Sequence, residues 1–573
     1  MHMNGPRTCQ WSRTQSWIAS FLFTAAIALA APKTVNNDRF WMDTSGKPIY
    51  SQGGGVYKFG DTWYWYGVHY AGAETYAASP GKPNSDTRFV SVTCYSSKDL
   101  VDWKFEGDVL DSNATGMSGT IWFGRMGVAY NKNTGKYVML GQDSGAAAGS
   151  GELFATSSSP TGKFVVDHVQ ATLPNVVNNT SGDQTVFLDD DGKAYLICSS
   201  SRGRAYIYVA PLREADYLAV EPAVQIAKTP GREGNCMFKH RGRYYVASSD
   251  LHGWNASHTY LQSATDILGP YGTEFVMGNT DMDFSHVSQT GFFFRVDGSE
   301  DTTVVYAGDR WSDFAGNGLG YSQWMPLSFS GDVPSMNSLS EWTLDAVTGR
   351  WAVGEGNNWV LNPSFEADRV SQTTLAGWTD STDRPVFPGG NILGGHTGRW
   401  ALNLYDSVDY VARKSQAITN IPNGTYTLSA WFRSSGKQKS LAVYARTPDG
   451  TEYPLNASGT ISDWKQLSLS GIAIADGKVE VGVRTVSNAR NWARIDDLVL
   501  VKQGVDQTGS RPAHASVREG RIRFAGESFV VEKGEAVEIF ELSGRSAGRM
   551  DGDGIRRTLR QAGFGGSVYF VRP

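Results

Sequence analysis

The sequence predicts an all-β protein: a five-bladed β-propeller, followed by a β-sandwich and a small C-terminal β segment. Its 573 residues exceed the size of one ordinary domain, so several domains are expected. Short aromatic segments with strand-like alternation recur five times before residue 354, each after a Gly or Asp turn. Longer alternating segments follow between residues 356 and 502, and these are typical of a sandwich.

The propeller is predicted for residues 38–353. In each recurring segment a tyrosine marks the second strand of a hairpin, and these tyrosines are 50 to 73 residues apart. Five units of four short strands at this spacing predict five blades around an axis. A long β-solenoid is the alternative, but its coils would be shorter and more regular. The tyrosines are Tyr64, Tyr137, Tyr195, Tyr245 and Tyr306.

The β-sandwich is predicted for residues 356–502. Thr425–Trp431 and Lys478–Arg484 alternate cleanly between apolar and polar residues, and Arg494–Val501 closes the domain. A polar linker then leads to residues 517–573, which are predicted to form a small β module. A sorting tail and a structural cap both remain open as roles for this module.

The N-terminus predicts export from the cell. Residues 1–30 have the pattern of a secretory signal peptide, because Arg7 and Arg13 precede an apolar run that starts at Trp17 and small residues surround Ala30. The run is shorter than a spanning helix of about 20 residues, and no other segment is apolar enough to span a membrane. A secreted or cell-surface location is therefore expected.

Charge and composition narrow the range of partners. The formal net charge is −5, which excludes binding to nucleic acid or to an anionic membrane through bulk charge. The 18 tryptophans and 25 tyrosines suit a carbohydrate ligand, as they also suit any large β-protein. A monomer is expected because a propeller is self-contained. Cys94, Cys198 and Cys236 are predicted to be buried free thiols, with one pairing left open.

Two carboxylates occupy equivalent points of successive hairpin units. Asp183 precedes the strand that leads to the turn at Asp189–Gly192, and Glu233 precedes the strand that leads to the turn at His240–Gly242. In units arranged around an axis, two such residues face one another. Two facing carboxylates are what cleavage of a glycosidic bond requires. The alternative for Glu233 is an exposed carboxylate at a strand end.

Through these segments the chain resembles glycoside hydrolase family 43 over about residues 40–353. The resemblance rests on the Asp183 hairpin, on Arg232-Glu233-Gly234 and on Tyr306-Ala-Gly-Asp-Arg-Trp311. Gln52-Gly-Gly-Gly-Val56, followed by Tyr64-Trp-Tyr-Gly67, is similar to the galactan-acting branch of that family. The resemblance implies an enzyme that hydrolyses O-glycosyl bonds. It also implies that a funnel at the propeller axis holds one terminal sugar, and that the reaction inverts the anomeric centre.

The resemblance also implies roles for individual residues. Glu233 matches the general acid, and Asp183 matches the residue that orients this acid and raises its pKa by like charge. The family's usual first-blade base is absent, and Gln289 matches the glutamine that replaces it in the galactan branch. A neutral amide acts as a base only as its imidic tautomer, or it positions a water; bonding to a sugar hydroxyl is the alternative role. Other candidates for the base are Asp43, Glu74 and Asp309.

One departure from the family concerns the sugar. The β-1,3-galactanases carry Glu-Arg-Pro at the start of the second blade, whereas this chain has Gly124-Arg125-Met126. Because the loss removes a partner of the galactose ring, the prediction is removal of terminal α-L-arabinofuranosyl or related furanosyl residues from a plant polysaccharide such as arabinogalactan. An exo-β-1,3-galactanase is the alternative. A propeller that binds carbohydrate without cleaving it is the alternative of another class, favoured by the missing first-blade carboxylate.

Further side chains are expected near the sugar. Tryptophans near blade starts, Trp65 among them, are candidates for stacking on sugar rings, with core packing as the alternative. Two arginines are candidates for bonding to sugar hydroxyls, and an ion pair is the alternative for Arg310. The predicted substrate-binding residues are Gln52, Trp122, Arg125, Trp254, Arg310 and Trp311.

No cofactor is required for this chemistry. Some relatives imply a structural Ca²⁺ near His286, although the run Asp189–Asp191 is equally typical of a tight turn. The sandwich resembles sugar-binding modules appended to such enzymes. Four of its tryptophans are candidates for a binding face, although core packing is predicted for most of them: Trp400, Trp431, Trp464 and Trp492.

Overall fold

The computed structural model describes residues 32–79, 86–115, 123–146, 149–312 and 317–504, together with Met1 and the strands of a C-terminal segment. The chain forms two compact units, Met1–Val505 and Asp506–Pro573. The predicted signal peptide and Trp122 lie outside the described residues.

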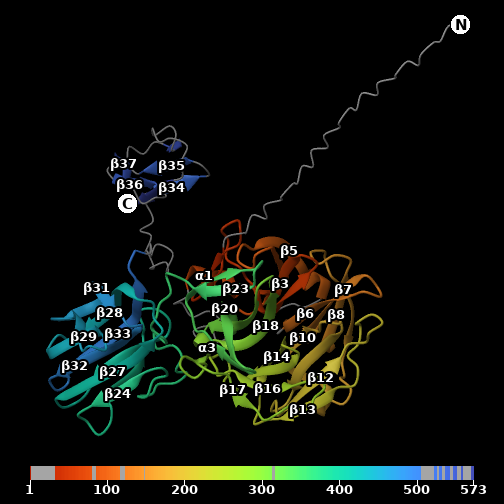
Figure 1. The fold of residues 1–573 in the computed structure, drawn as a ribbon, viewed down its shortest axis with the longest axis horizontal. Helices are drawn as coiled ribbons and strands as arrows, with labels where there is room; N and C mark the ends of the chain where they lie inside the picture. The colour runs from red at the N-terminus through yellow and green to blue at the C-terminus, as the bar shows by residue number, and fades with distance from the viewer. Residues whose placement is uncertain are drawn as a thin grey trace. The chain divides into compact units, whose positions relative to one another are not determined.

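Five four-stranded antiparallel sheets form the blades of a propeller, around which the colour of Figure 1 runs from red through yellow to green. Blade 1 holds β2 (Gln52–Phe59), β3 (Thr62–Tyr70), β4 (Phe89–Ser97) and β5 (Lys104–Asp111). Blade 2 holds β6 (Phe123–Asn131), β7 (Lys136–Ala146), β8 (Gly149–Ser157) and β9 (Val165–Gln170). Blade 3 holds β10 (Ser181–Leu188), β11 (Ala194–Ser200), β12 (Tyr206–Pro211) and β13 (Val224–Lys228). Blade 4 holds β14 (Glu233–His240), β15 (Arg243–Ser249), β16 (Tyr260–Ala264) and β17 (Phe275–Val276). Blade 5 holds β18 (Gln289–Asp297), β19 (Thr302–Ser312), β20 (Asn317–Ser330) and β21 (Val333–Met336).

The first strand of every blade lies innermost, and these five strands form a closed ring. β2 contacts β6, and the contacts continue through β10 and β14 to β18, which returns to β2. The aromatic segments predicted as second strands form β3, β7, β11, β15 and β19, so the predicted five-bladed propeller is confirmed. A separate three-stranded sheet joins β1 (Lys33–Asn36) to β22 (Glu341–Asp345) and β23 (Arg350–Val353).

Each innermost strand carries a β-bulge near its start. Such bulges locally unpair the ladder and re-aim the side chains beside them. Because the bulge recurs in all five blades, polar residues at the strand starts turn toward the axis instead of following the regular alternation. The register shifts lie between Gln52 and Gly55, Gly124 and Gly127, Ser181 and Gln184, Glu233 and Cys236, and Thr290 and Phe292.

Aromatic packing holds the propeller together. Trp65 is buried and contacts Trp41, Trp103 and Trp324, with ring centroids 4.9 to 5.8 Å apart. Of the two roles considered for Trp65, the structure agrees with core packing. The three cysteines predicted as buried thiols are free and buried.

The β-sandwich consists of two five-stranded antiparallel sheets. One has the order β24-β27-β32-β29-β30 and the other the order β25-β26-β33-β28-β31. The first holds β24 (Thr379–Thr382), β27 (Tyr410–Thr419), β32 (Lys478–Ser487), β29 (Gln438–Arg446) and β30 (Glu452–Asn456). The second holds β25 (Gly389–Leu393), β26 (Trp400–Tyr405), β33 (Trp492–Lys502), β28 (Gly424–Ser434) and β31 (Ile461–Ile474).

The sandwich tryptophans divide between interior and surface. Trp400 is buried in the core between the sheets, as predicted. Trp431, Trp464 and Trp492 are only partly buried and do not belong to that core, so the packing role predicted for most of the four is wrong for these three. Trp431 and Trp492 alternate with buried neighbours along their strands, which places them on the outer face, and the Trp464 ring lies 6.0 Å from the guanidinium of Arg433 on that face.

The remaining elements are short. The helices are α1 (Gly72–Ala78), α2 (Ser112–Thr115), α3 (Phe284–Val287) and the single 3₁₀ turn η1 (Val177–Asn179). The C-terminal unit contains β34 (Ile522–Ala525), β35 (Ser528–Val531) and β38 (Arg556–Thr558) in one sheet, and β36 (Ala536–Glu541), β37 (Ser546–Asp551) and β39 (Tyr569–Arg572) in another. Among the described residues, none of the helices has the length and apolar character needed to cross a membrane.

Candidate active site

The starts of the innermost strands converge, and their polar residues form one connected network. Glu233 begins β14 and Gln289 begins β18, while Asp183 and Arg125 lie inside the bulges of β10 and β6. The four residues come from four different blades, and hydrogen bonds or ion pairs link them all. The structure therefore brings together all three residues predicted for catalysis, Glu233, Asp183 and Gln289.

The Glu233 carboxyl group has the properties of a general acid. Its Oε1 accepts a hydrogen bond from Gln289 Nε2 at 2.8 Å, and its Oε2 lies 3.5 Å from Nη1 of Arg204. Burial, and then the negative charge of Asp183, raise the pKa of Glu233 to about 7, against the opposing charges of Arg204 and Arg125. A carboxyl group with this pKa still carries its proton near neutral pH and can donate it to a leaving group.

Asp183 has the opposite protonation state. Its Oδ2 accepts a hydrogen bond from Gly234 N at 3.0 Å and lies 3.4 Å from Arg125 Nε, while its Oδ1 accepts a hydrogen bond from Arg204. Burial favours the neutral form, but the two guanidinium groups outweigh it and lower the pKa of Asp183. Neighbouring carboxyl groups with separated pKa values can take different roles, so an ionised Asp183 keeps Glu233 protonated.

Gly234 fixes the distance between the start of β14 and the start of β18. Its backbone has φ of +61°, and a Cβ at this position would lie 2.3 Å from Thr290 O. A side chain would therefore push β14 away from β18 as well as strain the backbone. Only glycine permits this approach, and the approach is what directs the Gly234 N–H toward Asp183.

The Gln289 amide has a defined orientation. Its Oε1 accepts hydrogen bonds from Trp311 Nε1 at 2.8 Å and from Arg125 Nη2 at 3.1 Å. Both partners are donors only, so the oxygen cannot carry the proton of an imidic tautomer while these contacts last. In this arrangement Gln289 orients the Glu233 carboxyl group, and the second hydrogen of its Nε2 can still donate to a water.

Arg125 is the centre of the network and differs from its predicted role. It is 1% exposed, and its Nη1 donates a hydrogen bond to Asp309 Oδ2 at 2.8 Å. Asp309 also accepts a hydrogen bond from Gly53 N at 3.1 Å. Because Arg125 already contacts Asp183, Asp309 and Gln289, it holds catalytic side chains in place and is not positioned to bind sugar hydroxyls.

The other three carboxylates predicted as candidate bases differ in their contacts and exposure. Asp43 Oδ1 accepts hydrogen bonds from the backbone N–H groups of Ser45 and Lys47, at 2.8 and 3.0 Å, so it stabilises a turn. The Glu74 side chain is 68% exposed on α1, with His69 Nε2 3.6 Å away. Only Asp309 belongs to the network, and burial raises its pKa despite the charge of Arg125. The structure therefore gives neither Asp43 nor Glu74 a position beside Glu233.

The remaining predicted substrate contacts fall into three groups. Trp311 is buried, and its ring lies 4.9 Å from that of the partly exposed Trp254. Arg310 Nη1 donates to Asp38 Oδ1 at 3.3 Å, which agrees with the ion-pair alternative. Both polar atoms of the Gln52 amide are buried and have no hydrogen-bond partner among the described residues. The Gln52 amide thus remains available for a ligand, whereas Trp311 donates its hydrogen bond to Gln289.

The surroundings of His286 do not fit a calcium ion. Its Nε2 lies 3.4 Å from Asp38 Oδ2, and its Nδ1 lies 2.7 Å from Ser338 Oγ and 3.7 Å from Asp283 Oδ2. Burial disfavours the charged imidazole, but the two carboxylates prevail and raise the pKa of His286 to about 9. Among the described residues, no group of three or more His, Cys, Asp or Glu side chains is arranged to hold a metal ion, and a protonated His286 supplies positive charge to these carboxylates.

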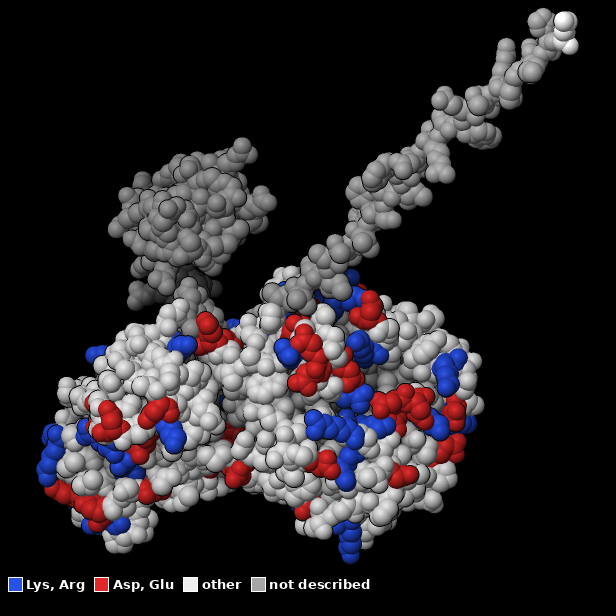
Figure 2. Space-filling view, viewed as in Figure 1, with Lys and Arg blue, Asp and Glu red and all other residues white. Residues whose placement is uncertain are grey.

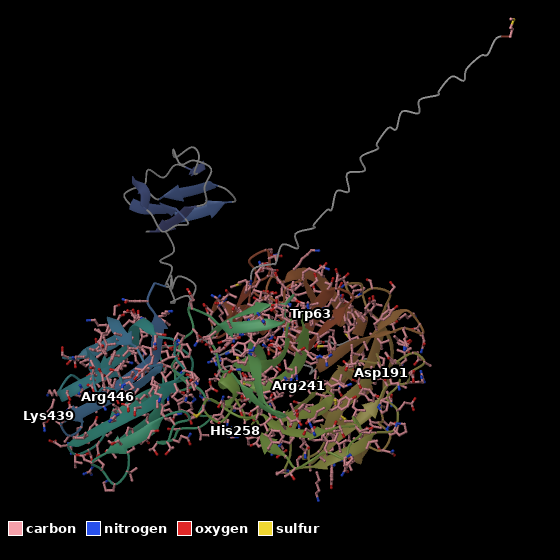
Figure 3. The ribbon with its side chains drawn as sticks, in the orientation of Figure 1. Trp63, Asp191, Arg241, His258, Lys439 and Arg446 are labelled. Carbon is pink, nitrogen blue, oxygen red and sulfur yellow. The ribbon has the colours of Figure 1, made fainter. Side chains whose placement is uncertain are left out.

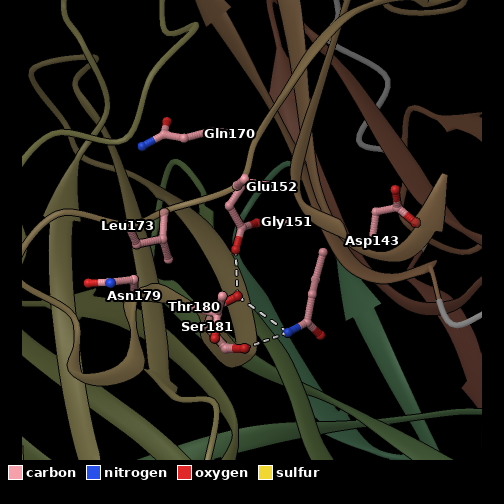
Figure 4. A pocket seen from close by; sticks show the side chains of 10 residues that line it. Asp143, Gly151, Glu152, Gln170, Leu173, Asn179, Thr180 and Ser181 are labelled. Carbon is pink, nitrogen blue, oxygen red and sulfur yellow. Dashed lines mark hydrogen bonds between the residues drawn. The ribbon is translucent and has the colours of Figure 1, made fainter. Parts of the chain in front are cut away.

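A pocket of about 290 Å³ lies between blades 2 and 3 (Figure 4). Within it, Glu152 accepts hydrogen bonds from Ser181 Oγ and from Gln184 Nε2. Gly124 is the cross-strand partner of Gln142, and Gln142 is in turn the cross-strand partner of Glu152. Because Glu152 is held against blade 3, it does not replace the carboxylate that is missing at Gly124. The lining residues are Gln142, Asp143, Gly151, Glu152, Gln170, Ala171, Leu173, Asn179, Thr180 and Ser181.

Two arginines near the site were not predicted from the sequence. Arg204 lies in the loop after β11, where a polar turn gives no sign that its side chain returns to Asp183 and Glu233. Arg369 belongs to the segment that precedes β24, and its Nη1 donates to Asp250 Oδ1 at 2.8 Å. Asp250 follows the end of β15 and also accepts a hydrogen bond from Ser257 Oγ at 3.0 Å, which closes the loop that carries Trp254.

Comparison with known proteins agrees with this architecture. The family model of glycosyl hydrolases family 43 matches residues 68–315. An exo-β-1,3-galactanase from Phanerochaete chrysosporium is 20% identical, with a TM-score of 0.51 over 82% of this chain and 100% of that chain. An exo-β-1,3-galactanase from Clostridium thermocellum is 22% identical, with a TM-score of 0.49 over 82% and 100% of the two chains. No curated protein matches the sequence. Residues 68–315 of the propeller thus match glycosyl hydrolases family 43, and with its neighbouring Glu233 and Asp183 the chain is a glycoside hydrolase.

Proposed function

We propose that the chain is an exo-acting, inverting glycosidase that releases terminal galactosyl residues from β-1,3-linked galactan. The observation that carries the proposal is the hydrogen bond from Gln289 to Glu233, with no carboxylate at the corresponding place of blade 1. The similarity to exo-β-1,3-galactanase structures over both propeller and sandwich supports the same choice. It is preferred to the arabinofuranosidase predicted from the sequence. The position of Gln289 and the structural similarity both favour galactan, whereas only Gly124 opposes it.

In the proposed mechanism, Glu233 transfers its proton to the glycosidic oxygen as the bond to the anomeric carbon breaks. Asp183 remains ionised and keeps Glu233 protonated until that step. A water attacks the anomeric carbon from the opposite face and releases its proton to solvent as the new C–O bond forms. Because the transition state resembles an oxocarbenium ion, the water need not be deprotonated before it attacks. Because the sugar lies between Glu233 and this water, the 2.8 Å hydrogen bond between Gln289 Nε2 and Glu233 Oε1 breaks when the sugar binds, and the Gln289 amide then orients the water.

An α-L-arabinofuranosidase is the second candidate, and Gly124 favours it. The described residues around Gly124 provide no free carboxylate for a galactose hydroxyl, because Glu152 is bound by Ser181 and Gln184. An arabinofuranosyl residue has fewer hydroxyl groups than a galactopyranosyl residue and so needs fewer partners. A site that lacks a hydrogen-bonding partner discriminates weakly in favour of the sugar that needs it.

Incubation with β-1,3-galactan, arabinan and arabinogalactan, followed by product identification, tests the proposal. Galactose from β-1,3-galactan, released first as the inverted anomer, is the expected result. Arabinose from arabinan, without galactose, would transfer the assignment to the second candidate. Binding without release of any sugar would contradict both and favour a propeller that only binds carbohydrate.

A further inference from the structure

The outer face of the second sandwich sheet carries a cluster of arginines and aromatic rings. β33 presents Trp492 and Arg494 on this face, and β28 presents Arg433, while the neighbouring Ala493, Ile495 and Phe432 are buried in the core. Trp464 lies on the adjoining strand β31. We call Arg433, Arg494, Trp464 and Trp492 the outer cluster. It belongs to the sandwich and shares no residue with the active site.

The two arginines of the outer cluster are direct cross-strand partners. Arg433 of β28 pairs with Arg494 of β33. Neither forms an ion pair with a carboxylate among the described residues. Arg433 Nε donates a hydrogen bond to Ser462 O at 2.9 Å, whereas Arg494 Nε is buried with no hydrogen-bond partner there. Like charges directly opposite one another destabilise a sheet, so this pair has an unfavourable energy that an anion would relieve.

The other sheet of the same domain shows how its arginines are neutralised. Arg446 Nη2 and Arg484 Nη2 share Glu452, at 2.6 and 2.8 Å, and Arg413 is paired with Glu480. The contrast lies within one domain of mixed charge, over which acidic and basic side chains are interspersed (Figure 2). The lack of a carboxylate partner therefore distinguishes the outer cluster from the arginines on the opposite sheet.

Each arginine of the pair has an aromatic ring beside it, Trp464 on the neighbouring strand β31 and Trp492 two residues before Arg494 on β33. The Arg433 guanidinium lies 6.0 Å from the Trp464 ring, and the Arg494 guanidinium lies 5.5 Å from the Trp492 ring. The three strands β33, β28 and β31 span about 10 Å at the usual strand spacing. Aromatic faces stack on the C–H faces of sugars, and the planar guanidinium fork matches a carboxylate in a bidentate geometry. The arrangement thus combines a sugar platform with a carboxylate receptor.

We propose that the outer cluster binds an acidic polysaccharide, with a uronic acid carboxylate between Arg433 and Arg494 and the adjoining sugars on Trp464 and Trp492. Neutral hydroxyl groups would satisfy the unpaired N–H groups but would leave the repulsion between the arginines. A carboxylate would accept hydrogen bonds from these N–H groups and would also reduce the repulsion between Arg433 and Arg494. The site is separate from the proposed hydrolysis, so either assignment can fail without the other.

Calorimetric titration of the full chain carrying Glu233→Gln, which prevents hydrolysis, tests the proposal. The probes are polygalacturonate, glucuronoxylan and glucuronic-acid-bearing arabinogalactan, each beside the same polymer after its carboxylates have been reduced to alcohols. At least one acidic polymer is expected to bind tenfold or more tightly than its reduced form, with the difference falling as salt is added. The double variant Arg433→Gln/Arg494→Gln is expected to abolish that difference.

Two further variants interpret the result. Trp464→Ala/Trp492→Ala is expected to weaken binding of acidic and reduced polymers alike. Lys439→Gln/Lys478→Gln removes two exposed charges from the opposite sheet and is expected to change nothing; Lys439 is labelled in Figure 3. Three outcomes would overturn the proposal. They are equal binding of the acidic and reduced polymers, no binding of any polymer, and a loss of affinity in the lysine variant as large as that in the arginine variant. Unchanged turnover of a short substrate by Arg433→Gln/Arg494→Gln, with Glu233 intact, shows that the fold is retained.

Discussion

Gln289 donates its amide hydrogen to Glu233 Oε1 at 2.8 Å while Trp311 and Arg125 hold its own oxygen. The proposed proton donor and the residue proposed to orient the water are thus part of one hydrogen-bond chain. A change at either end alters the geometry of the other. The predictions below separate the contributions of the members of this chain.

Glu233→Gln is expected to lower the rate on natural polysaccharide by about 10²–10⁴-fold, because the glycosidic oxygen loses its proton donor. An aryl glycoside with an acidic phenol needs less protonation, so its hydrolysis should fall much less. Initial rates on both substrates make the comparison. Glu74→Gln removes an exposed carboxyl group on α1 and serves as the control. Equal losses on both substrates would contradict the role of general acid.

Activity is expected to fall as the pH rises through about 7, where Glu233 loses its proton. Arg204 stabilises the ionised form of Glu233, so it lowers the pKa. Arg204→Met should therefore raise the pKa and move the alkaline limb of the kcat/KM profile to higher pH. Arg243→Met, which affects only an ion pair with Asp332 far along blade 4, is the control. A limb that stays in place or moves to lower pH would show that Arg204 does not act on Glu233.

Gln289→Ala is expected to lower turnover by at least tenfold and to allow partial rescue by azide, because the amide lines the position of the attacking water. The product of rescue should be a glycosyl azide of inverted configuration, which NMR can identify. Asp309→Ala should lose activity without rescue, since Asp309 lies behind Arg125. Rescue of the Asp309 variant instead would make that carboxylate the base.

Gly234→Ala is expected to abolish most activity, since a Cβ 2.3 Å from Thr290 O must displace β14 and with it the N–H that binds Asp183. Gly242→Ala is the matched control, because Gly242 also has positive φ, of +76°, but no atom within 4 Å of a Cβ. The control should lose about 1–2 kcal/mol of stability from backbone strain and keep its activity. Thermal unfolding and specific activity of the two variants are compared. An active Gly234→Ala would show that the close approach is dispensable.

The sequence was sufficient for the propeller because its signals are local. Turn residues and alternating aromatic segments such as Thr62–Tyr66 depend on near neighbours, and the paired carboxylates followed from their equivalent positions in two hairpins. The side-chain partners of Arg125 and Arg204 could not be predicted in this way. They depend on bulges that turn residues toward the axis and on contacts between blades far apart in sequence.

The same limit explains the tryptophans. Trp65 and Trp254 were both candidates for the axis, yet Trp65 is buried in the core, whereas Trp254 lies on a loop beside Trp311. In the sandwich, alternation predicted the strands correctly, but not which of the two faces of each strand meets the core. Trp400 and Trp431 lie on opposite faces for that reason.

The ion pair between Arg369 and Asp250 makes the sandwich a structural partner of the catalytic loop. A protein truncated before Arg369 would keep every residue of the catalytic network, yet the loop that carries Trp254 would lose its anchor. Its defect would then appear with a disaccharide too small to reach the sandwich at all. Such sandwich domains are usually regarded as modules that bind the polysaccharide. In this chain the sandwich would also affect the rate of hydrolysis.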